Sequence, residues 1–165
     1  MAFNDAAGWP AFWLYERRLY KDTAATHSEI DIMECYGSAP TSQKQLHCAV
    51  HRHPAYRPQP GNASDATGGN KSPSFIVDMT QSPFSVSGDL FDGVGAPGTY
   101  HTYGCKIDET WITMYFDGVV VGRFPTYPEA LKEHYMLVSL QQEEAPVVPV
   151  ETYLWVDYVK AYIKT

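Results

Sequence analysis

Three acidic side chains interrupt an apolar stretch of the sequence at residues 28–37. Successive side chains of a β-strand point to opposite faces, so Glu29 and Asp31 share one face. Glu34 falls on the other face unless one extra residue is absorbed around residues 32–33, as in a β-bulge. With that bulge, all three carboxyl groups line one surface.

Carboxyl groups crowded on one surface can carry out acid–base chemistry. Their mutual repulsion raises the pKa of at least one of them, so that one acid stays protonated at neutral pH while another is ionised. Such a pair suits glycoside hydrolysis. A retaining glycosidase holds its two carboxyl groups about 5 Å apart, whereas four steps along a straight strand span about 13 Å. Strand curvature, the bulge and the two long glutamate side chains must therefore close the gap.

Two other interpretations of the acidic stretch stay open at this point. One is a strand with a solvated acidic face, which is the common outcome for such a pattern. The other is a metal site, which we consider weaker because no histidine lies at ligand spacing to the acids in the sequence.

The composition predicts one all-β domain over residues 1–165. The chain has twelve glycines and twelve prolines, and 14% of its residues are aromatic, including twelve tyrosines. Short β-rich runs separated by such turn residues are typical of a β-sandwich. The formal net charge of −7 argues against a nucleic-acid partner and suits a neutral polymer better.

Neither a membrane span nor a signal peptide is visible in the sequence. No run of about 18 apolar residues occurs, and the first residues lack the basic and apolar segments of a signal peptide. Three cysteines, Cys35, Cys48 and Cys105, leave at least one thiol unpaired and match no zinc motif. We predict that they are free buried thiols.

Five motifs in a fixed order carry a family resemblance. They are W-P-A-F-W-L at 9–14, Leu46-His47, Y-H-T-Y at 100–103, the stretch 112–118 ending in Y-F-D-G, and W-V-D-Y-V-K-A-Y at 155–162. Together with the acidic stretch, they resemble glycoside hydrolase family 16, the laminarinase, lichenase and agarase group. The resemblance implies a concanavalin A-like jelly roll. Because only eight residues precede Trp9, it also predicts that the N-terminal strands of the sandwich are missing.

The resemblance implies a role for each acid. Glu29 corresponds to the nucleophile, which forms a covalent glycosyl-enzyme, and Glu34 to the acid/base. Asp31 lies between them, where it would share a proton with Glu29 and keep the pKa of Glu34 high.

Three further side chains are implied to bind substrate. Aromatic rings stack on the apolar faces of sugars, and Trp9 and Trp13, four residues apart, point to the same side of their strand. We expect at least one of them to face the sugar, with both in the core as the alternative. His47 stands where laminarinase-like members place a histidine against the sugar. The resemblance implies no cofactor for catalysis and a structural calcium ion at Asp157, where a solvated carboxylate is the alternative.

The implied function is endo-acting hydrolysis of β-1,3- or β-1,3-1,4-glucan with retention of configuration. The bulged E-I-D-I-M-E form of the acidic stretch favours laminarinase-like and galactanase-like members over the lichenase form. By the same resemblance the protein would be an extracellular or periplasmic monomer with a polysaccharide substrate and no nucleic-acid or membrane partner. The alternatives are a carbohydrate-binding jelly roll without turnover and an inactive fragment of a hydrolase.

The elements needed to position these residues are predicted as follows. We expect a hairpin turn at Asp117-Gly118, because this dipeptide supplies the positive φ angles of a two-residue turn. Residues 16–22 are predicted to form a loop or single turn, 54–74 a long loop, and 127–134 a short helix or turn. Strands are expected at 9–15, buried on both faces, and at 29–36, 45–53, 75–79, 100–106, 111–116, 119–124, 135–141 and 150–164.

Overall fold

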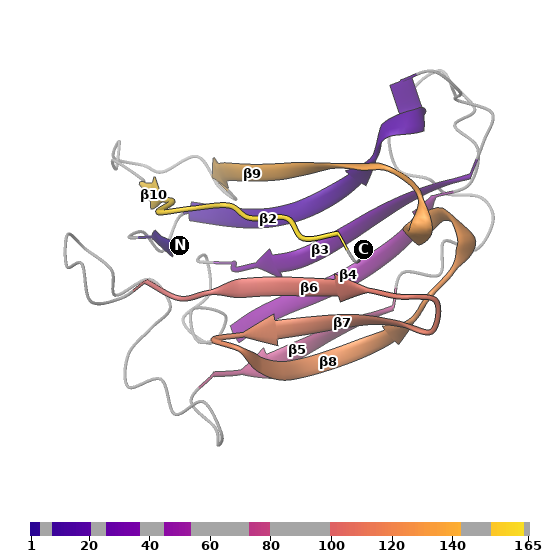
Figure 1. Cartoon of the computed structure of the whole chain (residues 1–165). Helices are drawn as coiled ribbons and strands as arrows, with labels where there is room; N and C mark the ends of the chain where they lie inside the picture. Colours follow the sequence, from indigo (N-terminus) through magenta and orange to yellow (C-terminus); the bar gives the residue numbers. More distant parts are fainter. Residues whose placement is uncertain are drawn as a thin grey trace.

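The protein is an all-β sandwich in which two antiparallel sheets pack face to face (Figure 1). This computed structural model describes residues 1–3, 8–20, 26–36, 45–53, 73–79, 100–142 and 153–163. The predicted fold class, a jelly-roll β-sandwich, is confirmed. Of the predicted loop at 54–74, residues 54–72 lie outside the described residues.

The larger sheet contains five strands in the order β5-β4-β3-β2-β9. Strand β3, which carries the three acids, lies at its centre and pairs with β2 on one side and β4 on the other. A central strand is held by hydrogen bonds along both edges, which fixes its register and the direction of its side chains. The five strands are β2 (Gly8–Glu16), β3 (His27–Glu34), β4 (Gln45–His53), β5 (Ser74–Asp78) and β9 (His134–Gln142).

The smaller sheet contains β6 (Tyr103–Ile107), β7 (Trp111–Phe116) and β8 (Val119–Pro125) in that order. The predicted turn between β7 and β8 is confirmed, since Asp117 and Gly118 have φ angles of 47° and 77°. Two 3₁₀ helices also agree with the predicted turns: η1 (Arg17–Tyr20) follows β2, and η4 (Pro128–Leu131) precedes β9.

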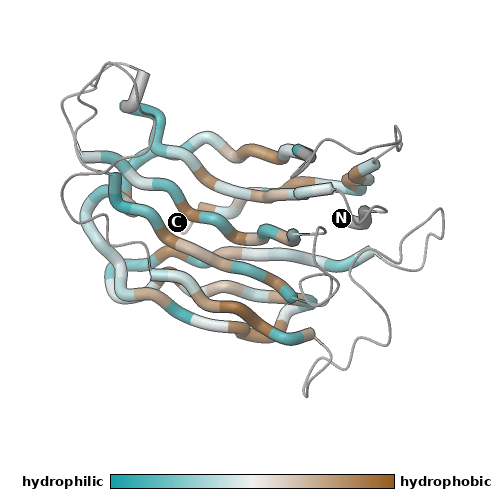
Figure 2. Tube along the Cα trace, turned by 180° about the vertical axis from the view of Figure 1, so that it is seen from behind, coloured by the Kyte–Doolittle hydropathy of each residue, from teal (hydrophilic) through white to brown (hydrophobic). Residues whose placement is uncertain are grey.

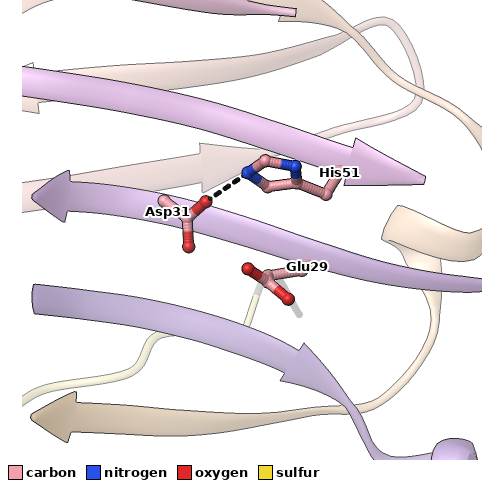
Figure 3. A group of neighbouring side chains, drawn as sticks. All are labelled: Glu29, Asp31 and His51. Atoms are coloured by element: carbon pink, nitrogen blue, oxygen red, sulfur yellow. Dashed lines mark ion pairs between the residues drawn. The ribbon is translucent and has the colours of Figure 1, made fainter. Parts of the chain in front are cut away.

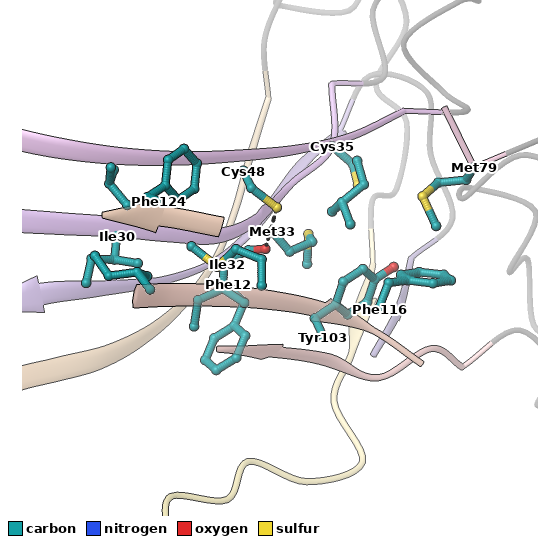
Figure 4. Close-up of a cluster of buried hydrophobic side chains, with 14 of the residues drawn as sticks. Phe12, Ile30, Ile32, Met33, Cys35, Cys48, Met79, Tyr103, Phe116 and Phe124 are labelled. Carbon is teal, nitrogen blue, oxygen red and sulfur yellow. Dashed lines mark hydrogen bonds between the residues drawn. The ribbon is translucent and has the colours of Figure 1, made fainter. Parts of the chain in front are cut away.

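One hydrophobic core fills the space between the two sheets (Figure 4). Polar and apolar residues alternate along the strands (Figure 2), so each strand turns one set of side chains inward. Ile30 and Met33 of β3 and Ile112 and Met114 of β7 are fully buried there. Burying one such side chain contributes about 1.5–3 kcal/mol. The packing therefore fixes which face of β3 points away from the smaller sheet.

Two strand predictions need correction. Strand β2 is not buried on both faces: Trp9 and Trp13 are partly exposed, and the neighbouring Phe12 lies in the core. Within the described residues 153–163, the predicted strand at 150–164 is reduced to β10 (Leu154–Trp155), which pairs with β1 (Ala2–Phe3). Alternating sequence alone does not make a strand without a neighbour to accept its hydrogen bonds. In the described segment after β10, odd-numbered and even-numbered side chains alike are exposed.

The prediction of free thiols is confirmed for all three cysteines. Cys35 and Cys48 are buried in the core, and Cys105 is partly buried. Burial raises the pKa of the Cys105 thiol to about 12, and those of the other two also rise, because a thiolate is poorly solvated there. None of the described helices has the length and apolar character needed to span a membrane.

Candidate active site

A β-bulge in β3 brings the three acids to one face, as predicted. Asp31 pairs with Ala49 of β4 and Glu34 pairs with His47, so three steps along β3 lie opposite two steps along β4. Pairing with β2 likewise skips Ile32, which identifies it as the extra residue. After the bulge the alternation resumes with its phase shifted by one residue, which turns Glu34 to the same side as Asp31.

This side of the five-stranded sheet, which carries Glu29, Asp31 and Glu34 and faces away from the smaller sheet, is the acidic face. It is only partly open to solvent. Asp31 is 4% exposed, whereas Glu29 and Glu34 are half-buried. The acid at the centre is therefore shielded, and the two glutamates at either end remain accessible.

Two histidines of β4 contact the first two acids. His51 Nε2 lies 2.9 Å from Asp31 Oδ2, and His53 Nε2 lies 3.0 Å from Glu29 Oε2. Figure 3 shows the carboxyl groups of Glu29 and Asp31 and the ring of His51 gathered on one side of the sheet. Burial raises the pKa of Asp31, opposed by the His51 contact, and the same contact raises the pKa of His51. The contact thus favours the charged forms of both groups, whereas burial favours the neutral form of Asp31.

Glu34 has a different environment from the other two acids. Trp9 Nε1 and the Tyr36 hydroxyl both donate to Glu34 Oε1, at 3.1 and 3.0 Å. Burial raises the pKa of Glu34 to about 7, the negative charge of Asp31 adds to this, and the two donors partly oppose it. Near neutral pH this carboxyl group therefore exists in both its protonated and its ionised form.

Both tryptophans of β2 lie on the acidic face, which agrees with the prediction that they point to one side. Trp9 reaches Glu34, as described above. Trp13 pairs with Asp31 in the sheet, and its Nε1 donates to Ser139 Oγ of β9 at 3.2 Å. Neither ring belongs to the core cluster. The alternative that both are buried in the core is therefore wrong.

His47 also lies on the acidic face, opposite Glu34 in the β3–β4 pairing. Its ring meets that of Tyr36 edge-on, with centroids 4.7 Å apart. Tyr36 and the two histidines that follow His47 on β4 were not among the predicted site residues. The alternation of side chains along a strand places them on the acidic face. Tyr36 is two residues after Glu34, and His51 and His53 lie four and six residues after His47.

A histidine does lie at ligand distance from the acids, contrary to what spacing along the chain predicted. Strand β4 runs antiparallel to β3 and places His51 directly opposite Glu29. One ligand atom each from Glu29, Asp31 and His51 lie within 4.8 Å of one another, and this is the only such group of three or more among the described residues. Asp157 lies in the exposed segment after β10, and the calcium site implied there stays a prediction.

Comparison with known proteins relates the fold to one family of enzymes. No protein-family model and no curated protein matches the sequence. Among solved structures, a glycoside hydrolase family 16 endo-glucanase from Bacteroides ovatus, in complex with G4G3G-2F-DNP, superposes with a TM-score of 0.60 and 26% identity, covering 85% of this chain and 51% of that one. A laminarinase catalytic domain from Thermotoga maritima gives a TM-score of 0.55 at 19% identity, covering 84% and 48%.

A second structure from Bacteroides ovatus, a family 16 protein of a mixed-linkage glucan locus in complex with G4G4G3G product, gives a TM-score of 0.57 at 24% identity. The match covers 84% of this chain and 52% of that one. The chain is thus similar in fold to the glycoside hydrolase family 16 endo-glucanases and laminarinases, and it spans about half of their length.

Proposed function

We propose that this protein hydrolyses β-glycosidic bonds within a polysaccharide and retains the configuration at the anomeric carbon. Glu29 is the nucleophile and Glu34 the general acid and base. The observation that carries this proposal is the environment of Glu34, which raises its pKa to about 7 and so lets it donate a proton near neutral pH. The similarity in fold to family 16 glucanases supports it.

In the first step, Glu34 protonates the glycosidic oxygen as the bond to the anomeric carbon breaks. A carboxylate oxygen of Glu29 attacks that carbon from the opposite face and forms a covalent glycosyl-enzyme. The His53 contact at Glu29 Oε2 restricts the orientation of this carboxylate. In the second step, the ionised Glu34 removes a proton from water, which attacks the same carbon and releases Glu29.

Asp31 acts between the two glutamates. It is nearly buried and paired with His51, so its charge stays close to both neighbours. That charge contributes to the raised pKa of Glu34. Asp31 therefore helps to keep the acid/base protonated before the first step.

The substrate we propose is β-1,3- or β-1,3-1,4-glucan. The rings of Trp9 and Trp13, partly exposed on the acidic face, offer apolar surfaces for stacking against sugar rings. His47 lies opposite Glu34, close to where the cleaved bond would lie. A neutral glucan also avoids repulsion from the acids and from the net charge of −7.

The test is reducing-sugar release from laminarin and from a mixed-linkage glucan. The chain is compared with its Glu29→Ala and Glu34→Ala variants, and with Glu109→Ala as a matched control, because Glu109 is exposed in the β6–β7 turn. Circular dichroism establishes that each variant is folded. We expect loss of more than a thousandfold in kcat for the first two and no change for the control.

Proton NMR of the newly formed reducing end tests retention, since the β-anomer should appear before mutarotation. A folded chain that releases no sugar from either glucan contradicts the proposal. Binding without release, measured with the same glucans, would instead make the protein a carbohydrate-binding module.

A further inference from the structure

We infer that Glu29, Asp31 and His51 form a binding site for a divalent transition-metal ion of the zinc class, and that the bound ion blocks glycan hydrolysis. The metal site itself depends only on the geometry of these three side chains. The block rests on the proposed function, because it requires Glu29 to be the nucleophile.

The three side chains are already close to the spacing of a zinc site. Their ligand atoms lie within 4.8 Å of one another, and Asp31 Oδ2 is 2.9 Å from His51 Nε2. Tetrahedral zinc with bonds of about 2.0–2.1 Å holds its ligand atoms about 3.3 Å apart. The Asp31–His51 pair must therefore open by a few tenths of an ångström, and the ligand oxygen of Glu29 must move inward by up to about 1.5 Å.

Binding replaces a hydrogen bond by two metal bonds. The Nε2 proton of His51 leaves to solvent when the ring is protonated, or moves to Nδ1 when the ring is neutral, and the lone pair of Nε2 in the neutral imidazole then binds the ion. The two carboxylates supply the remaining protein ligands and together neutralise the charge of the ion. A water molecule can take the fourth position, since the side chains of His51 and Glu29 are 27% and 24% exposed and the site is open on that side.

The donor set selects the class of metal. One imidazole nitrogen with two carboxylate oxygens suits Zn²⁺ and its neighbours in the transition series. Calcium needs six to eight oxygen ligands, and magnesium prefers oxygen ligands and retains several waters. His53, which contacts Glu29 Oε2 at 3.0 Å, provides the outer-shell hydrogen bond that orients a metal-bound carboxylate.

A bound ion would remove the nucleophile from the reaction. The carboxylate oxygen of Glu29 that binds the ion has lost the electron density with which it attacks the anomeric carbon. The ion and its water would also occupy space next to Asp31, between the two catalytic glutamates. Zinc would therefore inhibit hydrolysis, and a chelator would restore it.

The first experiment measures binding directly, by isothermal titration of the whole chain with ZnCl₂ and, separately, with CaCl₂. We expect one zinc ion per chain, and a calcium titration that is the same for the unaltered chain and for His51→Gln. His51→Gln and Asp31→Asn should each weaken zinc binding at least tenfold. His134→Gln, which replaces a histidine of β9 outside the group, should leave it unchanged. Absence of zinc binding, or equal binding by His51→Gln, overturns the site.

A second measurement on the unaltered chain does not depend on the variants being folded. Proton NMR should show the His51 ring resonances shifting as zinc is added. The ring resonances of His101, which contacts Asp117 next to the smaller sheet, should stay in place. A shift of the His101 resonances with none at His51 places the ion elsewhere and refutes the inference.

The block is tested by hydrolysis of laminarin with zinc added and then removed by EDTA. We expect at least tenfold loss of rate at zinc concentrations ten times the dissociation constant, and recovery with EDTA. A chain that binds zinc but cleaves no glucan contradicts the proposed function and supports the metal site. A chain that cleaves glucan at an unchanged rate with zinc bound refutes the block.

Discussion

Removing the hydroxyl group of Tyr36 should shift the pH dependence of the proposed hydrolase. This hydroxyl donates to Glu34 Oε1 at 3.0 Å and favours the ionised form of Glu34. Tyr36→Phe removes the donor, so the pKa of Glu34 should rise further. The proposed acid must be protonated in the first step, and its pKa of about 7 sets the alkaline limb of kcat/KM.

The size of the shift follows from the strength of the hydrogen bond. A bond to a charged group contributes about 1.5–3 kcal/mol, but Trp9 still donates to the same oxygen in the variant and water partly replaces the hydroxyl. A net loss of about 1–1.5 kcal/mol corresponds to a shift of about 1 pH unit. We therefore expect the alkaline limb to move from near pH 7 to near pH 8.

The assay is kcat/KM on laminarin from pH 5 to pH 10, with a parallel NMR titration of the Glu34 carboxyl carbon in the absence of substrate. Tyr158→Phe is the matched control, because Tyr158 is exposed in the segment after β10. An alkaline limb that stays in place or moves to lower pH in Tyr36→Phe refutes the reasoning. A shift in the limb without the same shift in the carboxyl titration shows that another group controls the rate.

Three further predictions concern stability. The folded pKa of Glu34, about 7, lies above its ordinary value of 4.5, so the fold loses stability as pH rises from about 4.5 to 7. Glu34→Gln should therefore stabilise the protein by about 1–3 kcal/mol at pH 8 and leave its stability unchanged at pH 4. Urea unfolding at the two pH values measures this, and equal effects at both would contradict the prediction. Gly122→Ala should cost about 1–3 kcal/mol, because its new methyl group would overlap the ring of Phe75, which packs against the core. Gly118→Ala, at φ 77° with open space around it, should cost about 1 kcal/mol from backbone strain alone; a larger loss than at Gly122 would show that the packing argument is wrong.

The sequence was sufficient where local patterns decide the structure. The strand 45–53 was predicted with its observed bounds, and the Asp117-Gly118 turn has both positive φ angles. The bulge near residue 32 was predicted too, since three acids could share a face only if the alternation was interrupted. In each case the deciding information lies within a few neighbouring residues.

Pairing between strands was the part that local patterns could not supply. Leu154–Trp155 forms the only part of the predicted strand 150–164 found among the described residues, because a strand depends on a neighbour distant in sequence. The same limitation hid the contacts of His51 and His53 with the acids. Alternation along β4 predicts which face of the strand carries these two histidines. It does not predict the register that places His51 opposite Glu29.

The bulge shows how the core and the acidic face depend on one another. Ile32 and Met33 are consecutive residues, yet both are buried in the core, 3% and 0% exposed (Figure 4). A regular strand would turn Met33 outward and bury Glu34, at the cost of placing a carboxyl group in an apolar environment. The bulge therefore buries both apolar side chains and, at the same time, places both glutamates on the same face. The packing of Ile32 and Met33 holds Glu34 in the position that its proposed role requires.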